Sequence, residues 1–329
     1  MELLSCGATE EVTGSCHLLK VGGKQVLIDC GLIQGRQKDE DRNRQPFPFD
    51  PASLDAVVLS HAHIDHSGRL PLLIKNGFQG PIYTHSASAD LCDTLLKDSA
   101  YLNFKNTQWA NKRRARKGKK PLQSLYEMQD AERALGQFET LEYGVEQEIV
   151  PGVSIRLSDA GHIVGSAVVE LFLSENGVDR KLVFSGDLGH RGTAILRDFT
   201  MIDDADLVLM ESTYGGRLHR PWDDTWEEIH GIAEDIQKRR GNVLIPAFSV
   251  GRTQNILYVF ARNYEKWKLN RWQMFLDSPM AIEATNIYLR HHRLYDPEAA
   301  KFWREKGSRL GMPNLKFSRS SQDLSLIHI

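Results

Sequence analysis

The sequence predicts an α/β fold with two successive lobes, and three features of the chain support this. Short apolar segments separated by turns fill the first third, which is typical of strands. Strand-like segments return between residues 153 and 210, after a long helical stretch. Beyond residue 214, helical and strand-like segments alternate, as they do in parallel α/β units. The 329 residues suffice for two ordinary domains, or for one large α/β domain that carries an insertion.

The first third contains three predicted strands, at residues 17–21, 25–29 and 54–60. The first two are joined by Gly22-Gly23, a dipeptide that is typical of a tight hairpin turn. The third is an apolar run that ends at Ser60, and such a run suits a strand buried on both faces. It leads directly into a loop rich in His and Asp, and active-site loops commonly follow strand ends of this kind.

Residues 87–141 have a helical and strongly charged pattern that includes the basic run Lys112–Lys120. The seven cations of this run repel one another unless solvent or anions screen them. The run is therefore either a solvated helix end and loop or a surface that contacts an RNA backbone. Under the second interpretation the candidate RNA-binding residues are Lys112, Arg113, Arg114 and Arg116.

Further strands are expected in the middle of the chain, at residues 153–157, 167–173, 181–185 and 207–210. The character of the sequence changes after Gly215-Gly216. A helix at 222–240, a strand at 242–246, another helix and a strand at 272–277 are predicted there. We therefore expect one lobe at residues 1–213 and a second at residues 214–329.

The composition, with 41% hydrophobic and 26% charged residues, is typical of a soluble globular protein. No apolar stretch reaches the length of about eighteen residues that predicts a membrane span, and the amino terminus lacks the pattern of an export signal. We therefore expect a cytoplasmic protein. The net charge of −2 shows no overall basic excess, although a local patch can still contact phosphates. The four cysteines are irregularly spaced without a C-x-x-C pair, which predicts buried free thiols.

The segment His61-Ala62-His63-Ile64-Asp65-His66 places four metal-capable side chains within six positions, directly after a predicted buried strand. In an irregular loop, His61 and His63 can point at one metal ion. Asp65 and His66 can turn toward a second ion about 3.5–4 Å away. Imidazole nitrogens and carboxylate oxygens without a thiolate suit a catalytic zinc, and manganese or iron use the same ligand types.

Three further segments carry potential site residues, one before this cluster and two after it. Asp29 lies in Leu27-Ile28-Asp29-Cys30-Gly31, His162 lies in Asp-Ala-Gly-His-Ile-Val-Gly-Ser-Ala, and Asp187 lies in Phe-Ser-Gly-Asp-Leu-Gly. With the histidine cluster, they resemble the motifs of the metallo-β-lactamase superfamily. The resemblance implies an αββα sandwich fold and a site that holds two zinc ions.

Roles for these residues also follow from the resemblance. Asp29 corresponds to a carboxylate that orients the histidine loop, and Asp187 to the carboxylate that bridges both ions. The implied metal ligands are His61, His63, Asp65, His66, His162 and Asp187. The implied catalytic residues are Asp65, Asp187, Glu211 and Asp29.

The segments after Asp187 resemble the β-CASP nucleases that cut RNA. Glu211 in Met-Glu-Ser-Thr-Tyr-Gly resembles the acidic motif at which β-CASP proteins depart from the lactamase lobe. Residues 246–254 and 277–281 resemble the inserted β-CASP domain, which small lactonases and thioesterases lack. In the first of these, Ser249 and Arg252 are candidate RNA-binding residues, with Arg252 either a bidentate phosphate donor or half of a structural salt bridge.

The resemblance is closest to bacterial and archaeal relatives of the pre-mRNA 3′-end cleavage endonuclease. It implies a zinc-dependent endonuclease with additional 5′-exonuclease capacity, acting in RNA processing or decay. The expected reaction is attack of a bridging hydroxide on phosphorus, which leaves a 3′-hydroxyl and a 5′-phosphate. Single-stranded RNA is the expected substrate, and a homodimer or an RNA-processing complex is the expected assembly.

Two histidine motifs that follow in family members are not visible before the last residue, Ile329. One of these histidines completes the second zinc site and the other pairs with the acid equivalent to Glu211. The sequence therefore resembles a fragment: an incomplete lactamase lobe and a partial β-CASP domain. As written, we expect the chain to bind the first zinc more tightly than the second and to have little nuclease activity.

Two other functions stay open at this point. A small-molecule hydrolase of the same superfamily, of the thioesterase or lactonase type, would use the same metal ligands. A scaffold subunit of an RNA-processing complex would not need them, and the intact histidine cluster disfavours that alternative.

Overall fold

The computed structural model describes residues 1–239, 241–306 and 310–319. The described chain divides into two compact units. Unit 1 comprises Met1–Ala160, Gly165–Asp187 and Thr200–Glu211, and unit 2 comprises Gly161–Val164, Leu188–Phe199 and Ser212–Ile329. The predicted boundary between residues 213 and 214 stays a prediction.

Unit 1 contains a first sheet, whose strands in the described part of the chain are β1 (Glu2–Gly7), β2 (Cys16–Val21), β3 (Lys24–Ile28), β4 (Ala56–Val58), β5 (Ile82–Thr84) and β6 (Phe138–Thr140). Strands β1 to β3 are antiparallel, whereas β3 to β6 are parallel. Both residues of the Gly22-Gly23 turn have positive φ, at 55° and 78°. That geometry matches the twist of a hairpin, so the predicted turn is confirmed.

A second sheet of unit 1, also within the described ranges, has the order β11-β10-β9-β8-β7. Its strands are β7 (Glu146–Val150), β8 (Val153–Asp159), β9 (Ala167–Glu175), β10 (Val178–Phe184) and β11 (Leu207–Leu209). Only the β10–β11 pair is parallel in this sheet. The strands predicted between residues 153 and 210 are therefore confirmed, with ends that agree or differ by up to three residues.

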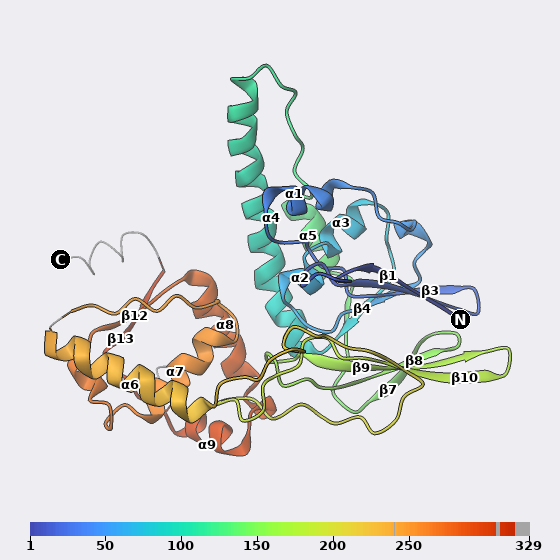
Figure 1. Ribbon diagram of the computed structural model, residues 1–329. Coiled ribbons are helices and arrows are strands. Elements are labelled where there is room, and N and C mark those ends of the chain that lie inside the picture. Colours follow the sequence, from blue (N-terminus) through green and yellow to red (C-terminus); the bar gives the residue numbers. More distant parts are fainter. Residues whose placement is uncertain (240, 307–309, 320–329) are drawn as a thin grey trace. The chain divides into compact units, whose positions relative to one another are not determined.

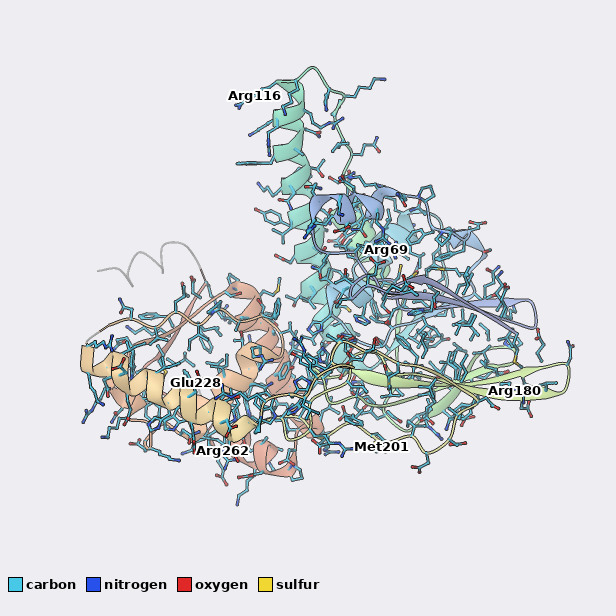
Figure 2. The ribbon with its side chains drawn as sticks, viewed as in Figure 1. Arg69, Arg116, Arg180, Met201, Glu228 and Arg262 are labelled. Carbon is cyan, nitrogen blue, oxygen red and sulfur yellow. The ribbon has the colours of Figure 1, made fainter. Side chains whose placement is uncertain are left out.

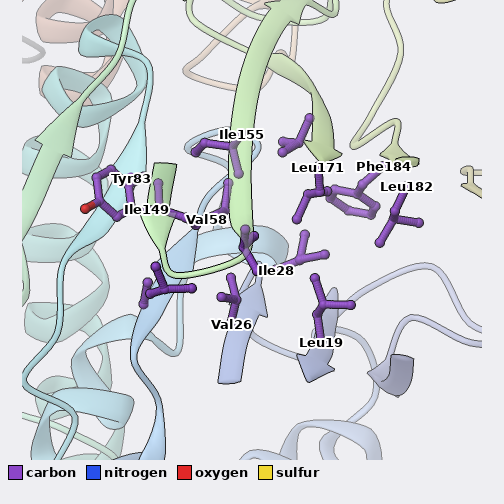
Figure 3. Packing of buried hydrophobic residues seen from close by; sticks show 14 of the residues in the cluster. Leu19, Val26, Ile28, Val58, Tyr83, Ile149, Ile155, Leu171, Leu182 and Phe184 are labelled. Atoms are coloured by element: carbon purple, nitrogen blue, oxygen red, sulfur yellow. The ribbon is translucent and has the colours of Figure 1, made fainter. Parts of the chain in front are cut away.

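The two sheets pack face to face around one apolar core (Figure 3). The first sheet contributes Leu19, Val26 and Ile28, and the second contributes Ile155 and Leu171, among others. These side chains alternate along their strands, so one face of each strand is buried in the core. This two-sheet sandwich confirms the predicted fold class.

Helices of unit 1 lie over the outer face of the first sheet (Figure 1). They are α1 (Gln37–Glu40), α2 (Ile64–Ser67), α3 (Leu70–Lys75), α4 (Ser86–Ala115) and α5 (Met128–Leu135), with 3-10 turns at Asp41–Arg44 and Pro51–Ser53. Leu27, Val57 and Leu59 are fully buried yet lie outside the core between the sheets. Strands β3 and β4 are therefore covered on both faces, which explains the apolar run predicted there.

Unit 2 is a smaller α/β unit. Its described elements are α6 (Trp222–Arg239), α7 (Arg252–Arg262), the 3-10 turn Leu269–Arg271, β12 (Met274–Asp277), α8 (Pro279–Arg290), the 3-10 turn His292–Leu294, α9 (Pro297–Lys306) and β13 (Leu315–Ser318). Strands β12 and β13 pair in parallel, as the alternation of helices and strands predicts.

The predicted strand at residues 242–246 is wrong. Residues 241–248 have no regular secondary structure, and Val243, Leu244 and Ile245 are 39%, 92% and 44% exposed. A strand is stabilised by hydrogen bonds to a neighbour and by burial of a face. No described strand pairs with this segment, so its apolar composition alone was a misleading signal.

Two expectations about the chain as a whole can be compared with the structure. All four cysteines are free thiols, as predicted, and Cys16, Cys30 and Cys92 are buried, whereas Cys6 is only half-buried. Among the residues that the structure describes, each helix is too short or too polar to span a bilayer.

The outer face of the second sheet carries a buried charge network centred on Glu170 of β9. Arg156 of β8 donates two hydrogen bonds to its carboxylate, at 2.9 and 2.8 Å, and Lys181 of β10 lies 2.9 Å away. Burial opposes ionisation of Glu170, but these two cations outweigh it and lower its pKa to about 2. Glu170 is only 1% exposed, so removal of its charge takes away the buried carboxylate to which Arg156 donates and leaves Lys181 with Asp204, at 2.8 Å, as its ion-pair partner.

We predict that Glu170→Gln lowers the free energy of unfolding by about 3 kcal/mol at pH 7, because a pKa depressed from 4.5 to about 2 corresponds to a stabilisation of that order. The folded-state pKa is the lower one, so this stabilisation is present above pH 4.5 and is lost as the pH falls toward 2. Chemical denaturation of both proteins between pH 7 and pH 3 measures the difference. The exposed Glu132→Gln is the control, and an equal effect of the two substitutions would contradict the prediction.

Candidate metal centre

The histidine loop begins where β4 ends and is locked to the backbone after β3. Backbone hydrogen bonds join Cys30 N to His66 O at 2.8 Å and Leu32 N to Ile64 O at 2.8 Å. A Cβ atom on Gly31 would lie 1.6 Å from the carbonyl oxygen of Asp65, so only glycine allows this approach. The loop therefore owes its position to main-chain contacts between segments more than thirty residues apart in sequence.

Asp29 is the buried charge at the centre of this arrangement. It follows β3 in a left-handed conformation, with φ of 57°, and its side chain is fully buried. Its carboxylate accepts hydrogen bonds from Ser15 Oγ at 2.9 Å, from Ser60 N at 2.8 Å and from Ser60 Oγ at 3.0 Å. The fourth contact is His66 Nδ1 at 2.6 Å. These contacts direct Nε2 of His66 away from Asp29, toward the other candidate ligands.

The structure brings His61, His63, His162 and Asp187 together. Each offers one ligand atom, and these atoms all lie within 4.8 Å of one another. Nε2 of His61 is 3.1 Å from Nδ1 of His63 and 3.8 Å from Oδ2 of Asp187. His162 lies in the loop that joins β8 to β9, and those strands stay paired as far as Asp159 and Ala167.

The donor set fits a divalent transition metal. Two nitrogens bound to one tetrahedral zinc at about 2.0–2.1 Å lie roughly 3.3 Å apart. The separation of 3.1 Å between His61 Nε2 and His63 Nδ1 is close to that value. Nδ1 of His61 lies 3.1 Å from Ser60 Oγ, so the opposite ring nitrogen is the one that faces the cluster.

Asp65 and His66 form a second group of candidate ligands, and this group also includes Asp187. Nε2 of His66 lies 3.2 Å from Oδ1 of Asp187 and 3.9 Å from Oδ2 of Asp65. Asp187 thus faces His61 with one carboxylate oxygen and His66 with the other. This placement is the one expected of a carboxylate between two neighbouring ions.

The electrostatics of the cluster favour added positive charge. Burial opposes the charged form of His66, but Asp29 and Asp187 outweigh burial and raise its pKa well above the ordinary value. Burial also raises the pKa of Asp65, an effect that His66 opposes and Asp187 reinforces. Both shifts reflect carboxylates that are crowded into a buried space, and a divalent cation would neutralise them.

Glu211 lies at the carboxyl edge of the second sheet. Its backbone N–H donates to Ser185 Oγ at 3.1 Å, and Ser185 precedes Asp187 by two residues. Strands β10 and β11 run in parallel, so Glu211 and Asp187 follow neighbouring strand ends. The structure thereby places this predicted residue at the same sheet edge as the bridging carboxylate.

The candidate RNA-binding residues lie on two separate elements. Arg252 is the first residue of α7, and its guanidinium lies 5.9 Å from the ring centre of Trp222. Ser249 Oγ is 3.5 Å from Ser278 Oγ. At the far end of α4, Lys112, Arg113 and Arg116 are exposed, whereas Nε of Arg114 donates to the carbonyl of Lys120 at 2.7 Å.

Sequence reasoning missed the residues that support the cluster. Ser15 and Ser60 donate hydrogen bonds to the carboxylate of Asp29. A buried carboxylate needs such donors, and this general requirement is the one indication of them that the sequence offered. In unit 2, the rings of His190 and His219 lie 4.4 Å apart, and the ring of His219 stacks on Tyr214 at 3.7 Å.

Residues 9–247 match the family model of the metallo-β-lactamase superfamily. The chain belongs to this superfamily. Residues 253–327 match the Beta-Casp domain, and residues 307–309 and 320–327 of that match lie outside the described part of the structure. Both matches confirm the resemblance predicted from the motifs.

Curated relatives extend well beyond this chain. Ribonuclease TTHA0252 of Thermus thermophilus is 42% identical over 298 residues, which cover 91% of this chain and 63% of the relative. Transcription termination factor FttA of Pyrococcus abyssi is 32% identical over 88% of this chain and 43% of its own length. FttA of Methanosarcina mazei is 29% identical over 93% and 46%. The chain thus spans between two fifths and two thirds of these relatives.

Membership in the superfamily implies binding of a divalent metal. The cluster of His61, His63, His162 and Asp187 supplies the ligands that such an ion needs. The divalent-metal site that the sequence predicts is therefore confirmed at this coarser level.

We predict that Asp29→Asn weakens metal binding 10- to 100-fold, because the amide keeps the shape of the side chain but removes the charge that orients His66. Titration calorimetry with Zn²⁺ on metal-free protein measures this change. The exposed Asp203→Asn is the matched control. Unchanged affinity in the Asp29 variant, with a normal thermal unfolding curve, would contradict the role of this carboxylate.

Proposed function

We propose that this chain contains the core of a zinc-dependent ribonuclease that cuts single-stranded RNA, as an endonuclease with additional 5′-exonuclease activity. The observation that carries the proposal is the convergence of His61, His63, His162 and Asp187 in a chain that also matches the Beta-Casp domain. A relative named as a ribonuclease, at 42% identity, supports RNA as the substrate. We further propose that residues 1–213 form the lactamase lobe and residues 214–329 part of the β-CASP domain.

The proposed site holds two zinc ions. The first is assigned to His61, His63 and His162, and the second to Asp65 and His66, with Asp187 shared between them. When bound, such ions supply a water nucleophile at neutral pH and positive charge beside the phosphate oxygens.

In the proposed reaction, the oxygen of water attacks phosphorus and the P–O3′ bond breaks. The 3′ oxygen leaves with a proton, so the upstream product ends in a 3′-hydroxyl and the downstream product begins with a 5′-phosphate. Asp29 keeps the ring of His66 in one orientation through its contact with Nδ1. We assign Glu211 to proton handling on the leaving-group side, because its backbone is anchored to Ser185, next to the segment that bears Asp187.

Unit 2 offers a candidate contact for the RNA backbone at the start of α7. Arg252 is exposed and lies over the ring of Trp222, which limits the rotamers of its long side chain. A guanidinium can donate two parallel hydrogen bonds to one phosphate. We propose that Arg252 binds a phosphate of the RNA and that Ser249 contributes a further hydrogen bond.

We predict that Asp187→Asn reduces RNA cleavage at least about 1,000-fold, because both groups of ligands lose their shared carboxylate. Because the chain as written is expected to cleave RNA weakly, both proteins are compared in single-turnover reactions with the protein in excess. Cleavage of a fluorescent single-stranded RNA by metal-free protein, before and after addition of Zn²⁺ or Mn²⁺, measures the difference. The exposed Asp203→Asn should cleave like the unmodified chain. Activity that survives both chelation and the Asp187 substitution would refute the proposed function.

We predict that Arg252→Gln raises the KM for RNA about 10-fold and changes kcat little, because the side chain binds phosphate in substrate and transition state alike. Steady-state kinetics on the same RNA separate the two constants. Arg304→Gln, an exposed arginine on α9, is the matched control. A large fall in kcat at unchanged KM would contradict a role in backbone binding.

A further inference from the structure

The outer part of α4 and the segment that returns from it form an arm of unit 1, which we define as residues 101–127. Helix α4 is 30 residues long, or about 45 Å at 1.5 Å per residue. The outer half of the helix extends beyond the other elements of unit 1 (Figure 1), and Arg116 lies at its tip (Figure 2). The outer part of the arm is therefore a solvated projection, whereas Tyr126 at its base is fully buried.

One face of the arm helix is covered by the returning segment. Asn111 exchanges two hydrogen bonds with the backbone of Leu122, at 2.8 and 2.7 Å. Nε of Arg114 donates to the carbonyl of Lys120 at 2.7 Å. Near the base, Ser99 Oγ lies 2.7 Å from the hydroxyl of Tyr126. These contacts hold the helix and the returning segment together, so the opposite face of the helix is presented in a fixed form.

That opposite face alternates aromatic rings with cations. Tyr101, Lys105, Trp109, Lys112 and Arg116 follow one another at spacings of four, four, three and four residues. At 100° per residue they lie within a sector of about 80°. Tyr101 is 51% and Trp109 is 71% exposed, and Nζ of Lys105 lies 5.4 Å from the ring centre of Tyr101.

The arm also concentrates positive charge. Residues 101–120 contain eight lysines and arginines and no aspartate or glutamate. The whole chain has a net charge of −2, so the remaining residues carry −10. The arm is thus a strongly basic patch on an otherwise acidic chain, a distribution that the balanced total conceals.

We propose that this face of the arm is a binding site for single-stranded RNA, separate from the metal cluster. The inference rests on the proposed function for its substrate class. Exposed aromatic rings can stack on unpaired bases of any sequence, while neighbouring cations contact the phosphates. Tyr101 and Trp109 are about 12 Å apart along the helix, so a flexible strand can reach both.

Charge argues against other occupants of the same face. A second copy of the chain that docked through the same face would bring an identical row of cations toward this one, which electrostatic repulsion opposes. A double-stranded nucleic acid would satisfy the cations but would leave the rings without unstacked bases. Single-stranded RNA satisfies both the charge and the rings.

The test measures binding without cleavage. Fluorescence anisotropy of a labelled 20-nucleotide single-stranded RNA is recorded with the full chain in chelator. We expect the double variant Tyr101→Ala with Trp109→Ala to raise the Kd at least about 10-fold, because each ring loses a stacked base. Phe104→Ala is the matched control, since Phe104 is 46% exposed on the same helix but points about 100° away from the centre of the proposed face. Trp109→Phe should retain binding.

The charge component is measured separately. We expect Lys105→Gln, Lys112→Gln and Arg116→Gln together to reduce the slope of log Kd against log salt concentration by about 2, because single strands release about 0.7 counterions per phosphate contact. Substitution of three exposed cations elsewhere, Arg133, Lys238 and Arg304, by glutamine should leave the slope nearly unchanged.

Several outcomes would overturn the proposal. These are a Kd for the double aromatic variant within twofold of the unmodified chain, an equal loss in Phe104→Ala, equal affinity for double-stranded RNA, or binding to phosphatidylserine vesicles that RNA cannot displace. Hydrolysis of a five-nucleotide RNA with Zn²⁺ serves as a separate readout of the metal cluster. If cleavage is absent but the arm variants still lose RNA binding, the proposed function fails and the arm proposal stands. If cleavage is normal and the arm variants bind RNA normally, only the arm proposal fails.

Discussion

The buried carboxylate of Asp29 is the contact on which the centre depends. An ionised group without water is tolerated only where donors surround it, and Ser15, Ser60 and His66 provide them. These donors come from the start of β2, the end of β4 and helix α2, so one charge requires three distant segments to meet. The same requirement orients His66. The buried carboxylate of Asp29 therefore both stabilises the fold of the lobe and positions a metal ligand.

Much of the site was predictable because several metal-capable residues lie within a few positions of one another in the sequence. Solvation or turn geometry alone seldom needs three histidines and an aspartate within six positions, so this cluster predicts a metal site. The structure places His162 and Asp187 beside His61 and His63 as expected. The supporting serines were not predictable in the same way. A serine is common at strand ends and loops, and nothing local to Ser15 indicates that Asp29 lies 2.9 Å away.

In the fold, too, features set by neighbouring residues were predictable, whereas features set by distant contacts were not. Alternation and turn chemistry predicted the hairpin at Gly22-Gly23 and most strands of the two sheets, because these depend on neighbours in sequence. The segment 242–246 has the composition of a strand but lacks a described neighbour, and composition cannot supply one. The basic run Lys112–Lys120 was visible, whereas its continuation into a row with Tyr101 and Trp109 became evident only once α4 was seen to be one unbroken helix.

The main-chain contacts between the histidine loop and residues 30–32 carry a further consequence. They join backbone atoms and leave the imidazole nitrogens and carboxylate oxygens of the cluster available, so the scaffold of the ligands does not rely on an ion for its order. Small metal-dependent domains that fold only around zinc lose their structure when a chelator removes it. In this lobe, by contrast, main-chain hydrogen bonds hold the loop, so we expect exchange of one ion species for another to involve little conformational entropy. Metal selectivity should then follow from ligand chemistry and cellular supply.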